Sequence, residues 1–388
     1  MSKSSDIKKL ISKFLETRQT TSRICEPLAI EDYIPQPIPD VSPPKWHLAH
    51  STWFFEQLIL VPYYSAYKIF NPQFSYLFNS YYNNLGDRVL RKNRGFLTRP
   101  TVAEIYEFRS YVDEKMLEFM ERPVLPEVLE TIEIGINHEQ QHQELLAYDI
   151  KYILGSQPFY PPLGDLFSPP EQKSQQSWLK IDGGIKEIGA EGEGFVFDNE
   201  LPRHQVLIRD FEISNRLVLN GEFVEFIDSG GYQNFNYWHS EGWDIIQSEE
   251  VMAPLYWVNV DGEWCHYTFK GLQKLNPNLP VMHLSYYEAF AYAQWKQCRL
   301  PTEFEWEAAS FSFEWGDLWE WTESAYLPYP GYKIPQGAIG EYNGKFMINQ
   351  KVLRGASVAT ASGHSRNTYR NFFHPSARWI FSGLRLAR

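Results

Sequence analysis

The stretch His138-Glu139-Gln140-Gln141-His142 decides how the first half of this chain is interpreted. In an α-helix, residues i and i+4 lie on the same face, so His138 and His142 present two imidazoles one above the other. Two imidazoles alone make a weak metal site, and a stable site needs at least one more ligand. The pattern therefore predicts a divalent-metal site whose third ligand has to come from elsewhere.

The carboxylates beside this pair are poorly placed to be that ligand. With 3.6 residues per turn, Glu139 lies about 100° from His138 around the helix axis and points aside. Glu144 lies about 200° from His142 and cannot share a metal with it. The third ligand is therefore expected from another helix.

A second predicted helix begins close to Trp46 and carries His47 and His50, and either imidazole can complete a site in the core of a bundle. The main alternative is a zinc protease, in which the glutamate of HExxH acts as the general base. That class needs a third ligand downstream of the second histidine, and the acidic candidates there have little support. Three neutral imidazoles suit iron(II) or a catalytic zinc, and ligand softness does not separate these ions.

The first 154 residues show the pattern of an antiparallel helical bundle, because long amphipathic segments alternate with short connections. The helices are expected to begin near Asp6 and near Trp46, to run from about Thr101 to Arg122 behind a capping box, and to run from Pro126 to just before Gly155. Pro62 is expected to end the second of these helices. The paired histidines fall in the middle of the last one.

Residues 155–177 contain five prolines among polar residues and are predicted to form a linker between two domains. Residues 178–388 have short β-type runs, at 206–208 and 352–353, and two clear helices, at 286–296 and 303–309. The predicted fold class is therefore α+β, with a helical domain at residues 1–154 and a mixed domain at residues 178–388.

Composition narrows the class of partner. The net charge of −12 disfavours nucleic acids and anionic membrane surfaces, since binding to either needs a positive field. The three cysteines show no CxxC pair and no disulfide-scaffold spacing, and the N-terminus lacks the apolar core of a signal peptide. A cytoplasmic protein that acts on small molecules is expected.

Several motifs, in matching order over nearly the whole chain, resemble those of the ergothioneine-biosynthetic sulfoxide synthases, the EgtB-like enzymes. The motifs are Pro44-Lys45-Trp46-His47-Leu48-Ala49-His50, Ser80-Tyr81-Tyr82-Asn83, Asn137 to His142, Phe197-Asp198-Asn199-Glu200, Leu300-Pro301-Thr302-Glu303, Trp319-Glu320-Trp321-Thr322, Tyr369-Arg370-Asn371-Phe372-Phe373 and Gly383-Leu384-Arg385-Leu386. The resemblance implies a DinB-like four-helix bundle joined to a mixed α+β domain like that of the formylglycine-generating enzyme, which is C-type-lectin-like.

The resemblance also implies a chemistry. Such enzymes use Fe(II) and O2 to join a thiol sulfur to C2 of the imidazole of hercynine, the Nα-trimethylated histidine, and leave a sulfoxide. The implied iron ligands are His50, His138 and His142. This set agrees with a third ligand from the second helix.

Substrate contacts are implied where the motifs match. Gln141 and Asn371 are implied in hercynine binding, and Phe372 and Phe373 can receive the trimethylammonium by cation–π contact. The alternative for the two phenylalanines is core packing.

Two further pairs are implied in the reaction. Tyr81 and Tyr82 are candidates for the donor of a proton or hydrogen atom during the oxygen chemistry, with at most one expected in direct contact. Arg88 and Arg91 are expected to clamp the carboxylate of the thiol substrate, and the alternative for them is a surface position.

The thiol donor is expected to be cysteine. In the branch that uses γ-glutamylcysteine, an acidic residue follows the aromatic of the Arg-Asn-aromatic motif, and here that position is Phe373. A selenosugar–hercynine coupling enzyme and a DinB-like metal-binding or thiol-transferase protein remain alternatives. Sulfatase maturation is disfavoured, because it needs reactive thiols late in the domain and no cysteine follows Cys298.

Overall fold

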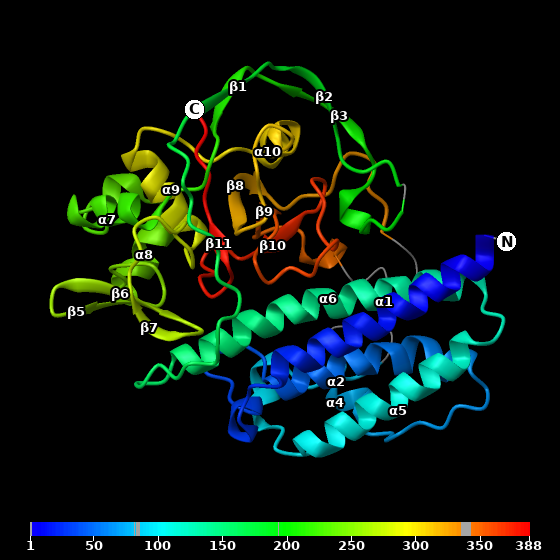
Figure 1. Cartoon of the computed structure of the whole chain (residues 1–388). Helices are drawn as coiled ribbons and strands as arrows, with labels where there is room; N and C mark the ends of the chain where they lie inside the picture. Colours follow the sequence, from blue (N-terminus) through cyan, green and yellow to red (C-terminus); the bar gives the residue numbers. More distant parts are fainter. Residues whose placement is uncertain (1, 81, 83–85, 193, 335–342) are drawn as a thin grey trace. The chain divides into compact units, whose positions relative to one another are not determined.

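The computed structural model describes residues 2–80, 82, 86–192, 194–334 and 343–388 (Figure 1). The chain divides into two compact units. The first, called the helical unit here, comprises Met1–Gly164 together with the short segment Thr360–His364. The second, called the mixed unit, comprises Asp165–Ala359 and Ser365–Arg388. The predicted α+β class is confirmed.

Four long helices build the helical unit, as predicted, and Figure 1 shows them side by side. They are α1 (Ser2–Cys25), α2 (Pro44–Phe55), α5 (Val102–Met120) and α6 (Pro126–Gly155). Helix α2 packs against both α5 and α6, and α1 packs against α6. Since every residue of α2 is buried, this helix lies in the core of the unit.

The predicted helix starts follow local chemistry. Thr101 caps α5: its Oγ1 accepts from the backbone N–H of Glu104 at 3.2 Å, and the Glu104 carboxylate accepts from the backbone N–H of Thr101 at 2.7 Å. This reciprocal pair is the capping box read from the sequence. Pro126 takes the first turn of α6, where a missing N–H costs nothing.

The prediction that Pro62 ends the second helix needs correction. Helix α2 ends at Phe55, but a π-helical turn, η2 (Glu56–Leu60), and a last helical turn, α3 (Val61–Tyr63), carry the helical path past the proline. The Val61 N–H reaches the Glu56 carbonyl, and Pro62 stands in the first turn of α3, where its lack of an N–H is tolerated. Short helices α4 (Phe74–Leu77), η1 (Ile30–Tyr33) and η4 (Arg91–Phe96) complete the unit.

The mixed unit contains small sheets. A four-stranded sheet has the order β10-β9-β8-β11. Its strands are β8 (Trp319–Ala325), β9 (Lys351–Gly355), β10 (Asn371–Phe373) and β11 (Ser382–Gly383), antiparallel except for the β11–β8 pair. A three-stranded meander consists of β5 (Trp257–Val260), β6 (Glu263–Thr268) and β7 (Gly271–Lys274).

Two antiparallel ribbons and four helices also belong to the described part of the unit. The ribbons pair β1 (Trp178–Ile181) with β4 (Phe211–Ser214), and β2 (Gly184–Ile188) with β3 (His204–Ile208). The helices are α7 (Asn220–Asp228), α8 (Ser240–Ser248), α9 (Tyr286–Trp295) and α10 (Glu303–Ala309). The predicted strands near 206–208 and 352–353 and both predicted helices are therefore confirmed.

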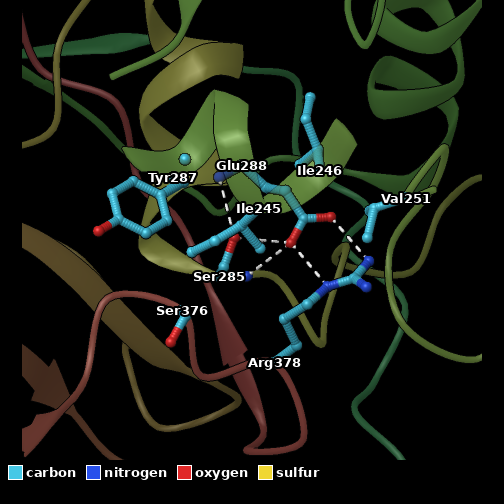
Figure 2. A pocket seen from close by; sticks show the side chains of 9 residues that line it. Ile245, Ile246, Val251, Ser285, Tyr287, Glu288, Ser376 and Arg378 are labelled. Carbon is cyan, nitrogen blue, oxygen red and sulfur yellow. Dashed lines mark hydrogen bonds and ion pairs between the residues drawn. The ribbon is translucent and has the colours of Figure 1, made fainter. Parts of the chain in front are cut away.

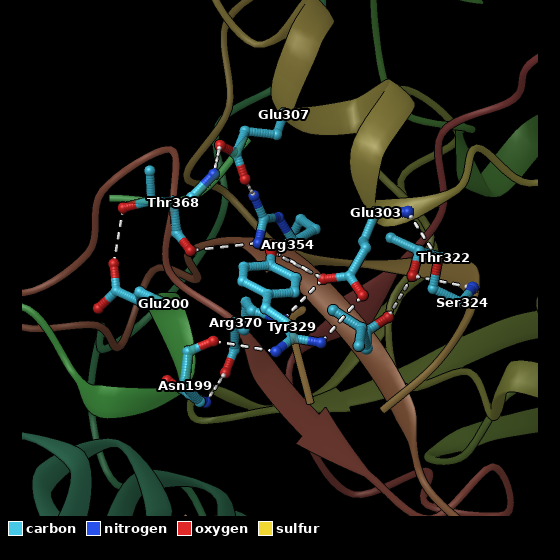
Figure 3. A network of polar contacts seen from close by, with 12 residues as sticks. Asn199, Glu200, Glu303, Glu307, Thr322, Ser324, Tyr329, Arg354, Thr368 and Arg370 are labelled. Carbon is cyan, nitrogen blue, oxygen red and sulfur yellow. Dashed lines mark hydrogen bonds and ion pairs between the residues drawn. The ribbon is translucent and has the colours of Figure 1, made fainter. Parts of the chain in front are cut away.

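Buried ion pairs fasten α10 to the strands it covers, and we call Glu303, Glu307, Arg354 and Arg370 the charge cluster (Figure 3). The Arg370 guanidinium donates to Glu303 through Nε at 2.7 Å and Nη2 at 3.0 Å. Arg354 donates to Glu307 and lies 3.8 Å from Glu303. Such a cluster fixes the geometry of the unit, because each carboxylate faces a guanidinium in a bidentate or shared arrangement.

A small hollow beside α8 and α9 is lined in part by polar side chains that are hydrogen-bonded to one another (Figure 2). The Glu288 carboxylate there accepts from the Ser285 backbone and hydroxyl at 2.8 Å each, from Tyr232 at 2.7 Å and from Arg378 at 2.9 Å. These contacts give Glu288 a structural role, because its carboxylate completes the capping box of α9 with Ser285.

Candidate metal centre

Helices α2 and α6 bring three histidines together. His50 comes from α2, and His138 and His142 from consecutive turns of α6, as their spacing predicts. One ring nitrogen of each lies within 4.8 Å of the others, and all three side chains are buried. Among the described residues this is the group whose donor atoms are arranged to hold a metal ion.

The ring of His50 is held by hydrogen bonding and by stacking. Its Nδ1 lies 2.7 Å from the carbonyl oxygen of Phe78 and must donate to it, so the lone pair is on Nε2. That Nε2 is buried and has no hydrogen-bond partner within the described part of the chain. Trp46 stacks on the imidazole at 4.5 Å between centroids and Trp53 at 5.6 Å. His50 therefore offers one lone pair in a fixed direction.

A close approach of α2 to α6 sets the environment of His138. The ring of Phe54 stacks on this imidazole at 4.8 Å. Gly135 lies one turn earlier on α6, and a Cβ there would meet ring atoms of Phe55 at 2.7 Å and of Phe54 at 2.9 Å. Only glycine leaves room for these rings, so this residue allows the helices to approach where the ligands meet.

Burial keeps the imidazoles neutral. It lowers the pKa of His138 to about 3 and holds the pKa of His50 and of His142 well below the ordinary value. For His47, burial lowers the pKa more than the neighbouring Asp149 raises it. A neutral imidazole with a lone pair is the form that binds a metal.

The structure separates His47 from His50, which the residue pattern alone left open. The Nδ1 of His47 lies 2.9 Å from the Nδ1 of His142, and its Nε2 lies 2.9 Å from Asp149 Oδ2. His47 is therefore hydrogen-bonded to the Nδ1 of His142, which leaves the Nε2 of that ring for a metal.

Glu139 is engaged in a different part of the bundle. Its carboxylate accepts from Arg18 at 2.8 Å and from Thr21 at 2.7 Å, and also from Arg109. Burial would raise the pKa of Glu139, but Arg109 and Arg18 outweigh burial and lower the pKa to about 2. With both oxygens committed, Glu139 is not positioned as the base of a zinc protease, and that alternative is rejected.

One of the two predicted tyrosines can be placed. Tyr82 is fully buried, its ring 5.5 Å from that of Trp53 and 6.4 Å from that of Phe54. These two rings are the ones that stack on His50 and His138. Tyr81 lies outside the described residues.

The arginine pair lies at the surface, whereas a third arginine in the same series is buried. Arg88 donates to the Ser80 carbonyl at 3.0 Å, and Arg91 pairs with Asp40; both side chains are exposed. Arg94, three residues further on, lies 3.3 Å above the Trp46 ring and donates to Ser42 Oγ at 2.8 Å. Arg94 was missed by the sequence analysis, although the three-residue spacing after Arg91 continues to it.

Helix α6 also binds the segment Thr360–His364, which belongs to the same unit. Thr360 Oγ1 donates to Glu144 at 2.8 Å, and His364 Nδ1 lies 3.1 Å from Gln140 Oε1. Gln141, which stands between Gln140 and the ligand His142 in the sequence, is half-buried. The contacts come from more than 200 residues away in the sequence, so no local pattern predicts them.

The predicted hercynine residues of the mixed unit lie together on β10. Asn371 Oδ1 accepts from the Phe372 backbone N–H at 2.9 Å. Phe372 stacks on Tyr326 at 4.1 Å between centroids, and Phe373 meets Trp379 edge-on at 6.0 Å. All three β10 residues are half-buried, so this strand presents an aromatic surface with an amide at its start.

Two family models cover most of the chain. The Sulfatase-modifying factor enzyme 1-like domain matches residues 164–312 and 314–388, and the DinB superfamily matches residues 13–146. A hercynine oxygenase of Mycolicibacterium smegmatis is 32% identical over 307 residues, which are 65% of this chain and 70% of that relative. This chain belongs to the hercynine oxygenase family. The predicted resemblance is therefore confirmed, and the chain is an oxidoreductase.

Further relatives match the chain over most or part of its length. A hercynine oxygenase of Mycolicibacterium thermoresistibile is 29% identical over 354 residues, 76% of this chain and 77% of that protein. A formylglycine-generating enzyme of Streptomyces coelicolor is 33% identical, but over only 37% of this chain. Within the described residues, no helix has the length and apolarity to cross a bilayer. The three-histidine group is compatible with a metal cofactor in such an enzyme.

Proposed function

We propose that this member of the hercynine oxygenase family is a non-haem iron(II), O2-dependent sulfoxide synthase of ergothioneine biosynthesis. It joins a thiol to C2 of the hercynine imidazole. The observation that carries the proposal is the buried group of three neutral histidines, with one donor nitrogen of each converging from α2 and α6.

The proposed reaction balances with dioxygen as the oxidant. Hercynine loses the hydrogen on C2, the thiol loses its S–H hydrogen, and a C–S bond forms with loss of two electrons. Oxidation of the resulting sulfide to the sulfoxide removes two more. O2 accepts all four electrons, leaving one oxygen atom on sulfur and the other in water.

His50, His138 and His142 would hold the metal, and three protein ligands leave open positions for substrate, thiol and oxygen. Iron is proposed rather than zinc, because Zn²⁺ has no redox chemistry and this reaction moves four electrons to O2. The bound iron would supply oxygen activation; the surrounding chain orients the ligands and keeps bulk water away, since Trp46, Trp53 and Phe54 wall the site.

We propose the same substrate-binding residues that the motifs imply. Gln141 and Asn371 would bind hercynine, and Phe372 and Phe373 would receive its trimethylammonium on an aromatic surface. Tyr81 or Tyr82 would donate a proton or hydrogen atom. The packing of Tyr82 against rings that stack on the proposed ligands supports its candidacy.

Arg88 and Arg91 would bind the carboxylate of the thiol substrate, and their exposure makes them accessible to it. We propose cysteine as that substrate. Phe373 is apolar and packs against Trp379, so this position lacks the carboxylate that would pair with the charged amine of a γ-glutamyl group. Unfavourable burial of an unpaired ammonium would then discriminate against γ-glutamylcysteine.

The test is anaerobic loading with iron(II), followed by oxygen uptake with hercynine and either cysteine or γ-glutamylcysteine, with products identified by mass spectrometry. A hercynyl-cysteine sulfoxide from cysteine is the expected product. Faster turnover with γ-glutamylcysteine would overturn the choice of donor. No hercynine-dependent uptake with either thiol would overturn the synthase proposal, and a selenosugar substrate would be the next to try.

A further inference from the structure

A chain of three buried side chains leads away from the metal centre. His142 Nδ1 lies 2.9 Å from His47 Nδ1, and His47 Nε2 lies 2.9 Å from Asp149 Oδ2. The same oxygen of Asp149 accepts from the Ser42 backbone N–H at 2.7 Å. The side chains of His47 and Asp149 are each only 3% exposed, so solvent does not compete for these bonds.

The directions of these hydrogen bonds follow from their end point. A carboxylate only accepts, so the Nε2 of His47 carries the proton and donates to Asp149. The Nδ1 of the neutral His47 is then an acceptor, and His142 must donate to it from Nδ1. That leaves the lone pair of His142 on Nε2, the nitrogen available to the cluster. Loss of the chain frees His142 to adopt the other tautomer, whose Nε2 carries a proton and cannot bind a metal.

His50 reaches the same tautomer by a different route. Its Nδ1–H donates to the backbone carbonyl of Phe78, which no side-chain substitution removes. The tautomer of His142 depends instead on two replaceable side chains. The two ligands therefore differ in how firmly the sequence fixes them.

We propose that His47 and Asp149 are positioning residues that hold His142 in its metal-binding tautomer and orientation. The inference rests on the proposed metal function of the three histidines and adds to it two residues that neither contact substrate nor bind the ion. Hydrogen-bonded partners behind metal ligands commonly change metal affinity by about 10–100-fold.

Two pairs of variants distinguish loss of the hydrogen bonds from a change in side-chain size. His47→Leu and Asp149→Ala remove the chain. His47→Gln keeps an amide oxygen that accepts from His142 Nδ1. Asp149→Asn keeps an acceptor in place of Oδ2, because the Ser42 N–H favours the amide oxygen there over the amide nitrogen. His283→Leu, at a buried histidine of the mixed unit, is the matched control.

The measurement uses the metal alone. The affinity of the full chain for iron(II) is determined anaerobically by competition with a chelator, and the visible spectrum of the cobalt(II)-loaded protein reports the ligand set. We expect His47→Leu and Asp149→Ala to bind iron roughly 10–100-fold more weakly with altered cobalt bands. His47→Gln and Asp149→Asn are expected to recover most of the affinity, and His283→Leu to match the wild type.

Three outcomes decide against a positioning role. His47→Leu and Asp149→Ala with wild-type affinity and spectrum would overturn it, and so would amide variants as weak as the apolar ones. Losses in proportion to the unfolded fraction, measured by circular dichroism, would make the role merely structural. If the wild type itself binds no iron, the proposed function fails and this inference fails with it.

Discussion

Two of the buried polar clusters in the molecule differ in how their polar atoms are paired. One is the three-histidine group of the helical unit, and the other is the charge cluster of the mixed unit. In the charge cluster, Glu303 faces Arg370 and Glu307 faces Arg354, so the cluster is complete in the sense that each carboxylate has a counter-charge from the chain (Figure 3).

The histidine group is incomplete in another sense, because its neutral donor atoms converge as the ligands of a metal do. The buried Nε2 of His50 has no hydrogen-bond partner among the described residues, and the donor atoms of its two neighbours face it across at most 4.8 Å. Leaving a buried polar atom unpaired costs about 1–3 kcal/mol. The Nε of Arg354 in the charge cluster is also buried and unpaired among the described residues, so one unpaired atom does not mark a site. The convergence of three donor atoms separates the metal site from the structural support.

The substitution with the largest expected effect removes a ligand from the three-histidine group. His142→Ala is expected to abolish iron binding and hercynine-dependent oxygen uptake, because two imidazoles make a weak site. The fold should survive, as judged by circular dichroism. His204→Ala, at a half-buried histidine of the mixed unit, is the control and should retain both properties. Turnover by His142→Ala would refute the ligand assignment.

The second prediction concerns a substitution that breaks an ion pair of the charge cluster. Glu303→Gln leaves the buried guanidinium of Arg370 without its counter-charge, and breaking such a pair costs about 3–5 kcal/mol. A denaturant titration should show lower stability with unchanged iron(II) affinity of the folded protein. Glu263→Gln, whose partner Lys274 is exposed, is the control and should leave the unfolding midpoint unchanged. Equal stability of Glu303→Gln and the control would contradict this difference between buried and exposed pairs.

The sequence could predict the local half of the histidine group and the start of a neighbouring helix. The i, i+4 spacing on α6 places His138 and His142 together, and the capping box marks where α5 begins. The pattern could not choose between His47 and His50, because they lie one turn apart on α2 and the choice depends on how α2 is rotated against α6. Periodicity shows which face of a helix is buried, but not what that face meets.

The partners that complete the site environment come from far along the chain. Asp149 lies 102 residues from His47, and Arg109 lies 30 residues from Glu139. Strands such as β11, with two residues, are too short to carry a period-two pattern, so only the longer apolar runs of the mixed unit were predicted. The tertiary packing that decides these contacts leaves no local sequence signal.

The third prediction tests whether hercynine is bound beside the charge cluster. Asn371 directly follows Arg370, a member of that cluster. Loss of a hydrogen bond to a charged substrate group costs about 1.5–3 kcal/mol, so Asn371→Ala should raise the apparent KM for hercynine roughly tenfold or more. The KM for the thiol should change less. Steady-state kinetics with each substrate varied in turn will check this, and equal effects on both would remove Asn371 from the hercynine site.

The smallest effect is expected from a substitution in the packing next to His138. Gly135→Ala gains about 1 kcal/mol of helix propensity but overpacks the Phe54 and Phe55 rings, which costs about 1–3 kcal/mol. The net loss of stability should therefore be roughly 0–2 kcal/mol. Because Phe54 stacks on His138, iron(II) affinity should fall as well. Gly221→Ala, where the new Cβ would lie 3.1 Å from the Cβ of Pro277 in the mixed unit, should leave the affinity unchanged. If both variants bind iron like the wild type, the ring of Phe54 is not needed to hold His138 in place.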